Sequence, residues 1–254
     1  MSYERKYYFK VYLAGYAVWI IAFEIVGRYA ATLNTYNPTT TIDMMIPLLP
    51  DFIWFYELCY IFPFLPLLIV KDFHRLNITI LSIILATISA FGVYLVYPIA
   101  FPQPELGQSL AEKILYIEYT FDFYPGANKL PGMHITFAWL VYFAVRGQNL
   151  SKLGEAIVLF LTVMITLSTL FVKQHIIFDV AAGILWAFLA WGLSKYLYTY
   201  LTNPKAVPLV ALHQMLKNTG VLFIYTSAFG IAILALLWGI RKVVNEVDPL
   251  SWTL

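Results

Sequence analysis

The chain carries a series of apolar stretches that are long enough to cross a lipid bilayer as helices. A transmembrane helix needs about 20 consecutive apolar residues to cross the hydrocarbon core. Charged residues make up only 12% of the chain, whereas soluble domains contain about 25%. The sequence therefore predicts an all-α, polytopic membrane protein. The seven candidate spans lie at residues 11–33, 52–70, 78–98, 131–145, 153–172, 175–195 and 219–240.

The first and fourth apolar stretches differ from an ordinary span in their surroundings or their length. The first follows the basic segment "ERK", as the apolar part of a signal peptide would. It continues to about Leu33 without a clear cleavage site, so we expect a retained helix. The fourth is short, so we expect one of its ends to lie within the thickness of the membrane.

The distribution of Lys and Arg predicts the orientation of the helices, because basic residues gather in short cytoplasmic loops. With a cytoplasmic N-terminus, ten basic residues fall on the inner side and five on the outer side. The ten are Arg5, Lys6, Lys10, Lys71, Arg75, Arg146, Lys152, Lys195, Lys205 and Lys217, and the five are Lys113, Lys129, Lys173, Arg241 and Lys242. This orientation makes segments 34–51 and 99–130 outer segments. Within the second, residues 108–123 have helical periodicity and many aromatic side chains, which favours a helix along the membrane interface.

Two polar residues, His175 and Asp179, stand four residues apart at the beginning of the sixth span, in "VKQHIIFDVAAG". Side chains at i and i+4 lie on the same face of a helix. We expect Asp179 to accept a hydrogen bond from one ring nitrogen of His175, which leaves the other nitrogen with its lone pair outward. This is how a carboxylate orients a nucleophile or a base. The alternative is that the two side chains only satisfy each other.

The ends of three predicted spans bring further polar groups to the same outer side. The fourth span has His134 in its first turn, and the sixth begins at His175. The fifth ends at Ser168 and Thr169. Because consecutive spans alternate in direction, these groups are expected to meet.

A site built in this way is expected to attract an anion, and phosphate is the natural one. The N-termini of the fourth and sixth helices each offer free backbone N–H groups and about half a positive charge. Lys129 and Lys173 add full charges, and His134 is placed to protonate a leaving oxygen. Two histidines also suit a metal, but the sequence offers no third ligand at a suitable spacing. A histidine at a helix start is also often structural.

Further charged residues lie within or beside the spans. Glu24 and Arg28 are an i, i+4 pair that either forms an ion pair or lines a lipid headgroup pocket, since Arg28 is nearer the outer side. Glu57 in the second span either contacts the same pocket or accepts a hydrogen bond inside the bundle. Asp122, in the outer segment, is assigned to the same candidate pocket.

Three segments, "YPIAFPQP", "DFYPGANKLPGMH" and "STLFVKQHIIFDVAAG", resemble in order and spacing the type-2 phosphatidic acid phosphatase family, which shares its fold with vanadium haloperoxidases. The likeness is nearest to the branch with inositol-phosphorylceramide and sphingomyelin synthases. It implies a six-helix core with its site at the outer membrane face. The chain then divides into an N-terminal helix and outer loop (1–45), the phosphatase-like core (46–195), and a cytoplasmic connector with an additional helix (196–254).

The resemblance implies a role for each of three residues. His175 would take the phosphoryl group and Asp179 would orient it. His134 would protonate the leaving alcohol and then activate the incoming water or alcohol. The scheme needs no metal and no other cofactor. The residues expected to bind the substrate phosphate are Lys173, Lys129, Gly132, Ser168, Thr169, Gln103 and Asn128.

The chain departs from the family pattern at several positions around the phosphate. These are Val96 in place of a lysine, Gln103 in place of an arginine, Gly132 in place of a serine, Thr169 in place of an arginine and Ile176 in place of a tyrosine. Three explanations stay open. Lys129 and Lys173 replace the lost charge, or the substrate is a phosphodiester of lower charge, or the chain is a catalytically silent relative.

We therefore expect a membrane enzyme that hydrolyses or transfers a phosphoryl group or phospho-headgroup of a lipid. Its partners would be the phosphorylated lipid, the bilayer and an acceptor, which is water or an alcohol. A net charge of only +2 gives no basic patch for nucleic acid. The alternative is a lipid-binding or partner-binding membrane protein without activity. The sequence leaves open the lipid, the acceptor and the oligomeric state.

Overall fold

The computed structural model describes residues 3–121 and 126–202, and within these ranges the chain is helical without a strand. The predicted span 219–240 lies outside the described residues. The elements follow in chain order: α1 (Tyr3–Ala30), α2 (Thr41–Met45), the 3₁₀ helix η1 (Pro50–Phe52), α3 (Ile53–Ile61), the 3₁₀ helix η2 (Phe62–Phe64), α4 (Leu65–Ile69), α5 (Phe73–Val96), α6 (Leu110–Phe121), α7 (Met133–Val145), α8 (Lys152–Phe171) and α9 (Ile177–Leu201).

The described residues contain five helical segments that are long and apolar enough to cross a membrane. They are α1, the segment from η1 to α4, α5, α8 and α9. This confirms the prediction of an all-helical membrane protein with several spans. α7 is also apolar but has only 13 residues, which corresponds to about 20 Å of helix. The short fourth stretch of the sequence is thus a short helix.

Local sequence signals explain where several of these helices begin or bend. α5 begins at Phe73, five residues before the predicted 78, because Asp72 accepts the backbone N–H of His74 as an N-cap. The second span changes from α3 to the 3₁₀ helix η2 and then to α4. Pro63 and Pro66 lie at this change, and a proline cannot donate a helical hydrogen bond.

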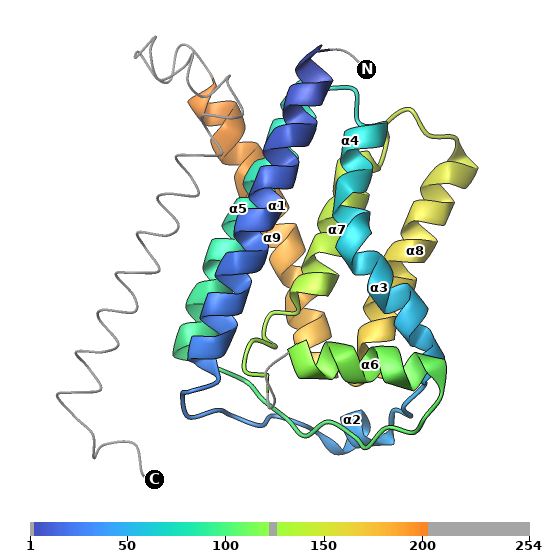
Figure 1. Cartoon of the computed structure of the whole chain (residues 1–254). Helices are drawn as coiled ribbons and strands as arrows, with labels where there is room; N and C mark the ends of the chain where they lie inside the picture. Colours follow the sequence, from blue (N-terminus) through green and yellow to red (C-terminus); the bar gives the residue numbers. More distant parts are fainter. Residues whose placement is uncertain (1–2, 122–125, 203–254) are drawn as a thin grey trace, which may run out of the picture.

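α7 is the central helix of the bundle, in contact with α5, α8 and α9. Ten of its 13 residues are buried. α1 packs against α5, and α3 packs against α8. Figure 1 shows these helices running along one common direction, with α6 crossing one end of the bundle. We call this end the α6 end.

The predicted interfacial helix within 108–123 is confirmed as a helix, α6. Its buried residues Ala111, Leu115 and Tyr119 pack in one cluster with residues of η1 and α3. The hydroxyl of Tyr119 donates a hydrogen bond to the carbonyl of Val172, with 2.6 Å between the oxygens. α6 is thereby tied to the chain that follows α8.

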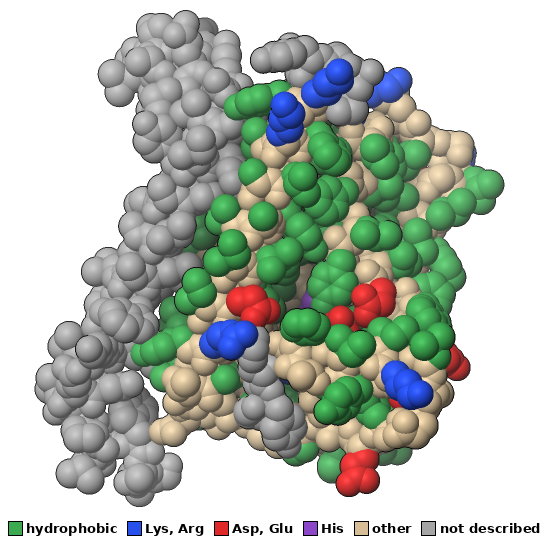
Figure 2. Space-filling view, viewed as in Figure 1, with side chains coloured by type: hydrophobic (Ala, Val, Ile, Leu, Met, Phe, Trp, Pro, Cys, Tyr) green, Lys and Arg blue, Asp and Glu red, His purple; other side chains and the backbone are tan. Residues whose placement is uncertain are grey.

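The opposite end, where α4 and α7 finish, is the basic end. Here Arg5 donates hydrogen bonds to the carbonyls of Leu67 and Val70 at the end of α4. Arg75 does the same for carbonyls at the end of α7. A cation at a helix C-terminus offsets the partial negative charge of the unpaired carbonyls. Figure 2 shows Lys and Arg side chains gathered at this end, at the top of the view.

Candidate active site

His175 and Asp179 form the predicted hydrogen bond, but in a different local structure from the expected one. His175 Nδ1 lies 3.2 Å from Asp179 Oδ2. α9 begins at Ile177, so His175 precedes the helix, and the predicted start of the span at 175 was wrong by two residues. The Asp179 carboxylate reaches back over the first turn and also accepts the N–H of Ile176, at 3.3 Å. The pair therefore belongs to a helix cap rather than to one face of a helix.

The backbone before His175 is fixed by the end of α8. The carbonyl of Thr169 accepts the N–H groups of both Gln174 and His175, each at 3.0 Å. Lys173 adopts a left-handed backbone conformation, with φ 56°, which turns the chain from α8 into α9. The imidazole of His175 is buried, with only 5% of the residue exposed. A proton on Nδ1, shared with Asp179, leaves Nε2 with its lone pair.

His134 lies beside His175, as the alternating direction of the spans predicts. The centroids of the two imidazole rings are 5.8 Å apart. His134 is half-buried in the first turn of α7. The Oη of Tyr56 lies 3.3 Å from both ring nitrogens of His134, and the two rings pack edge to face at 4.8 Å. The sequence analysis missed Tyr56, which is recognisable only as half of an i, i+4 tyrosine pair with Tyr60 on α3.

A close contact between two glycines sets the position of α7 against α9. A Cβ on Gly183 would lie 2.8 Å from the carbonyl oxygen of Gly132. Thr136 bridges the two helices, because its hydroxyl is 3.0 Å from the carbonyl oxygens of both glycines. The N–H of Gly132, expected to be available for phosphate, points to the carbonyl of Asp179 at 3.4 Å. The contact brings the first turn of α7, with His134, against the first turns of α9.

The two lysines predicted to bind phosphate lie in different places. Lys129 is buried, with 2% exposed, and its ammonium donates a hydrogen bond to Oε1 of Gln174 at 2.7 Å. It therefore lies next to the residue that precedes His175. Lys173 instead donates to the backbone carbonyls of Asp43 and Ile46. The carbonyls of the outer loop thus hold its ammonium, and its assignment to the phosphate stays a prediction.

Asp43, which the sequence analysis did not select, connects the outer loop to α9. Its Oδ1 accepts the N–H of Ile177 at 2.8 Å, and its other oxygen bonds Thr40 in a capping box. Burial opposes ionisation of Asp43, but the hydrogen bonds from Thr40 and Ile177 and the charge of Lys173 together lower its pKa. Burial lowers the pKa of Lys173, against the attraction of Asp43. The capping pattern "TTTID" was the available sequence signal.

The N-terminus of α9 is consequently occupied by carboxylates. The N–H of Ile176 bonds Asp179, and the N–H of Ile177 bonds Asp43. The expectation that the sixth helix offers free N–H groups to an anion is wrong for these two positions. α7 differs, because its N-cap residue Gly132 provides no side-chain cap.

Most of the remaining residues predicted to bind phosphate contact the protein itself. The hydroxyls of Ser168 and Thr169 are buried and donate to carbonyls one turn earlier in α8, at 2.7 and 2.8 Å. Asn128 is buried against α1, where its amide nitrogen would lie 3.1 Å from a Cβ on Gly27. Gln103 is half-buried, two residues after Phe101, whose ring centroid is 5.8 Å from the Lys129 ammonium.

Of the residues assigned to the candidate headgroup pocket, Arg28 and Glu57 lie within the described residues. Arg28 and Glu24 form the predicted ion pair, with 3.7 Å between Nη2 and Oε2. Glu57 lies next to Glu118, a carboxylate of α6 that accepts the hydroxyl of Tyr60 at 2.6 Å. Asp122 lies outside the described residues. In Figure 2 a histidine is visible through a narrow gap, with acidic side chains on both sides of it.

Three buried polar atoms of residues considered for the site have no hydrogen-bond partner among the described residues. They are Asp179 Oδ1, Gln174 Nε2 and Gln103 Nε2. Gln174 is 1% exposed and Asp179 is fully buried. Because buried polar groups are nearly always paired, such atoms are candidate contacts for a ligand or for water. Gln174 directly precedes His175 in the sequence, and Asp179 is bonded to it through its other carboxylate oxygen.

A comparison with protein-family models finds no matching model, and comparisons with curated proteins and with solved structures find no match either.

Proposed function

We propose that the chain is a membrane enzyme that transfers or hydrolyses a phosphoryl group or phospho-headgroup of a lipid through a phosphohistidine. The observation that carries this proposal is the arrangement of His175, Asp179 and His134. The first is bonded to a buried carboxylate, and the second imidazole stands 5.8 Å from it between ring centroids. A phosphoryl group next to both rings would be within reach of a nucleophile and a proton donor.

The reaction would proceed in two displacements. Nε2 of His175 attacks the phosphorus, the bond to the lipid alcohol breaks, and the proton of His134 goes to the leaving oxygen. His134, now neutral, takes a proton from the incoming water or alcohol, whose oxygen attacks the phosphorus and releases His175. Asp179 holds the imidazole in one orientation and stabilises its positive charge, as carboxylates do in catalytic triads.

The charges available for the phosphate favour a substrate with a low negative charge. Lys129 is the buried cation next to His175, through Gln174, whereas Lys173 is bonded to the outer loop. The unpaired Nε2 of Gln174 is a neutral donor. One buried cation and amide donors suit a phosphodiester with one negative charge better than a phosphomonoester with two. The six-helix phosphatase-like core and the outer location of the site remain parts of this proposal.

The second candidate function is a lipid-binding membrane protein without activity. The observation that favours it is the occupation of the α9 N-terminus by the carboxylates of Asp43 and Asp179. These groups repel an anion at a place where a phosphate would gain from the helix dipole. A substrate must then gain enough from Lys129 and from the first turn of α7 to overcome this repulsion.

The test compares the wild type with His175→Ala and with His213→Ala, a histidine in the segment predicted to be cytoplasmic. Each protein is reconstituted in liposomes with phospholipids, lipid phosphates and isoprenyl phosphates, with and without ceramide or diacylglycerol. Products are followed by mass spectrometry, and the phosphorylated intermediate is trapped with lipid substrates whose phosphate group is radiolabelled. We expect products and an acid-labile phosphoenzyme in the wild type and in His213→Ala only. Identical lipid profiles for all three proteins would support the inactive alternative.

A further inference from the structure

A cavity lies at the basic end of the bundle, away from His134 and His175. It has a volume of about 440 Å³ and lies between the start of α5, the end of α7 and the part of α9 from Phe188 to Lys195. Pockets for small ligands have volumes of about 300–1,000 Å³. We propose that this cavity binds the phosphate of an anionic glycerophospholipid, whose acyl chains lie along the outer surface of α9.

The lining of the cavity is strongly basic. Arg75, Arg146 and Lys195 contribute three cations, against one carboxylate, that of Asp72. Asp72 is engaged at the start of α5, where it accepts the N–H of His74 at 2.9 Å. Like charges around one cavity repel each other, and a bound anion removes this repulsion.

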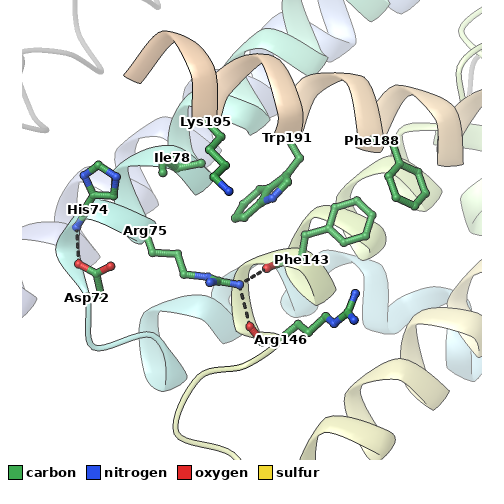
Figure 3. Close-up of a pocket in the computed structure, with 9 residues that line it drawn as sticks. All are labelled: Asp72, His74, Arg75, Ile78, Phe143, Arg146, Phe188, Trp191 and Lys195. Atoms are coloured by element: carbon green, nitrogen blue, oxygen red, sulfur yellow. Dashed lines mark hydrogen bonds between the residues drawn. The ribbon is translucent and has the colours of Figure 1, made fainter. Parts of the chain in front are cut away.

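One of these cations is held in place by the protein. The Arg75 guanidinium donates to the carbonyls of Phe143, Ala144 and Arg146 at 2.6, 2.7 and 2.7 Å. It also lies 5.7 Å from the centroid of the Trp191 ring. Figure 3 shows Arg75 and Lys195 extending from α5 and α9 toward the same space beside Trp191. The site is therefore formed before a ligand arrives.

The other two cations are available to a ligand. Arg146 and Lys195 are exposed, and neither forms an ion pair within residues 3–121 and 126–202. The charge of Arg75 already offsets the carbonyls at the end of α7. Most of the attraction for an anion is thus expected from Arg146 and Lys195.

The opposite wall of the cavity is aromatic and continues onto the lipid-facing surface. The rings of Phe143 and Phe188 are 4.7 Å apart between centroids, and Phe143 also contacts Trp191. Phe188 is 55% exposed, next to the exposed Leu185 and Leu189 of the same helix. A ligand that fits this combination is anionic at one end and apolar at the other.

The location in the membrane favours a phospholipid over free phosphate. The distribution of Lys and Arg predicts that the basic end faces the cytoplasm. The cytoplasmic leaflet contains anionic lipids, and basic pockets between transmembrane helices on that side bind their headgroups. A soluble phosphate ester would leave the aromatic wall uncovered.

The experiment measures binding of phosphatidylglycerol with brominated acyl chains to the full-length protein in detergent micelles. Bromine quenches tryptophan fluorescence at short range, so the difference between wild type and Trp191→Phe isolates the signal of this site. The double variant Arg146→Gln, Lys195→Gln leaves Arg75 and its hydrogen bonds to the end of α7 in place. We expect it to bind about 25-fold more weakly, from about fivefold for each charge removed.

The matched control is Lys71→Gln, Lys152→Gln, which removes two exposed lysines that do not line the cavity. We expect its affinity to change less than twofold. Brominated phosphatidylcholine should not quench Trp191, and inorganic phosphate should not compete for the site. The proposal is overturned if both double variants lose affinity equally, if neither loses it, or if inorganic phosphate competes as well as the lipid. The catalytic proposal is tested separately, since none of these variants changes His134, His175 or Asp179.

Discussion

The buried ammonium of Lys129 donates a hydrogen bond to Oε1 of Gln174, the residue directly before His175. Both side chains are almost fully buried. A buried partner left without its hydrogen bond costs about 1–3 kcal/mol. Lys129 thus supports the backbone next to the proposed nucleophile, in addition to any direct effect of its charge on a phosphate.

We predict that Lys129→Met lowers the stability of the protein by about 1–3 kcal/mol, because Gln174 loses its donor. Gln174→Leu in the same background should recover part of this loss. The measurement is a double-mutant cycle by thermal unfolding in detergent, with coupling expected in the range of about 0.5–3 kcal/mol for residues in contact. Additive effects of the two changes would contradict the contact.

Asp179→Asn is predicted to keep the fold and to lose most of the catalytic activity. An amide oxygen can still accept the Ile176 N–H, so the start of α9 remains capped. The charge that orients and stabilises the His175 imidazole is lost, and the comparable change in a catalytic triad lowers kcat by about 10⁴. The checks are turnover of the identified substrate and the unfolding temperature. Unchanged turnover would remove the orienting role of Asp179.

Tyr56→Phe is predicted to reduce turnover by on the order of tenfold, because His134 loses a hydroxyl that contacts its ring nitrogens. The aromatic ring remains, so the packing against His134 should persist. The control is Tyr60→Phe, which removes a hydroxyl bonded to Glu118 rather than to His134. The pH dependence of kcat should change in the first variant alone. An equal change in both variants would indicate a general effect on α3.

Asp43 is predicted to stabilise the protein above about pH 4 only. Its pKa is lower in the folded state than the ordinary value of 3.8. A group with a depressed pKa contributes stability above its unfolded pKa, and this stability disappears as the pH falls through the folded pKa. Asp43→Ala should therefore lower the unfolding temperature at pH 7 and have a smaller effect below pH 4. Asp51→Ala, an exposed acid of the same outer segment, should have little effect at either pH.

Gly183→Ala and Gly192→Ala are predicted to have opposite effects, although both glycines lie in α9. A methyl group at Gly183 would meet the carbonyl oxygen of Gly132 at 2.8 Å. Separating α7 from α9 to accommodate it should cost about 1–3 kcal/mol. A methyl group at Gly192 meets nothing within 4 Å, so the higher helix propensity of alanine should stabilise by up to about 1 kcal/mol. Thermal unfolding of the two variants decides this.

The sequence was sufficient to predict the features that depend on hydropathy and on the alternating direction of consecutive spans. Six of the predicted spans have helical counterparts in the described residues, and His134 and His175 meet because their helices start at the same end. The hydrogen bond between His175 and Asp179 was also predicted correctly, although the cap geometry was not. Periodicity describes residues inside a helix and does not locate its first residue.

The sequence was not sufficient for contacts between distant segments. Whether Lys173 faces a phosphate or the carbonyls of Asp43 and Ile46 depends on how the outer loop folds back, about 130 residues away. Asp43 and Tyr56 were missed for the same reason. Neither a carboxylate in an outer segment, such as Asp43, nor a tyrosine within a span, such as Tyr56, has a local pattern that identifies a distant partner.

The length of α7 has a further consequence. It has 13 residues, against 24 in α5, and Figure 1 shows it beginning well short of the level at which α6 crosses. His134, in the first turn of α7, therefore lies deeper in the bundle than α6. In the proposed reaction, a lipid phosphate would have to reach that depth to meet His134, so we expect turnover to depend on the thickness of the host bilayer.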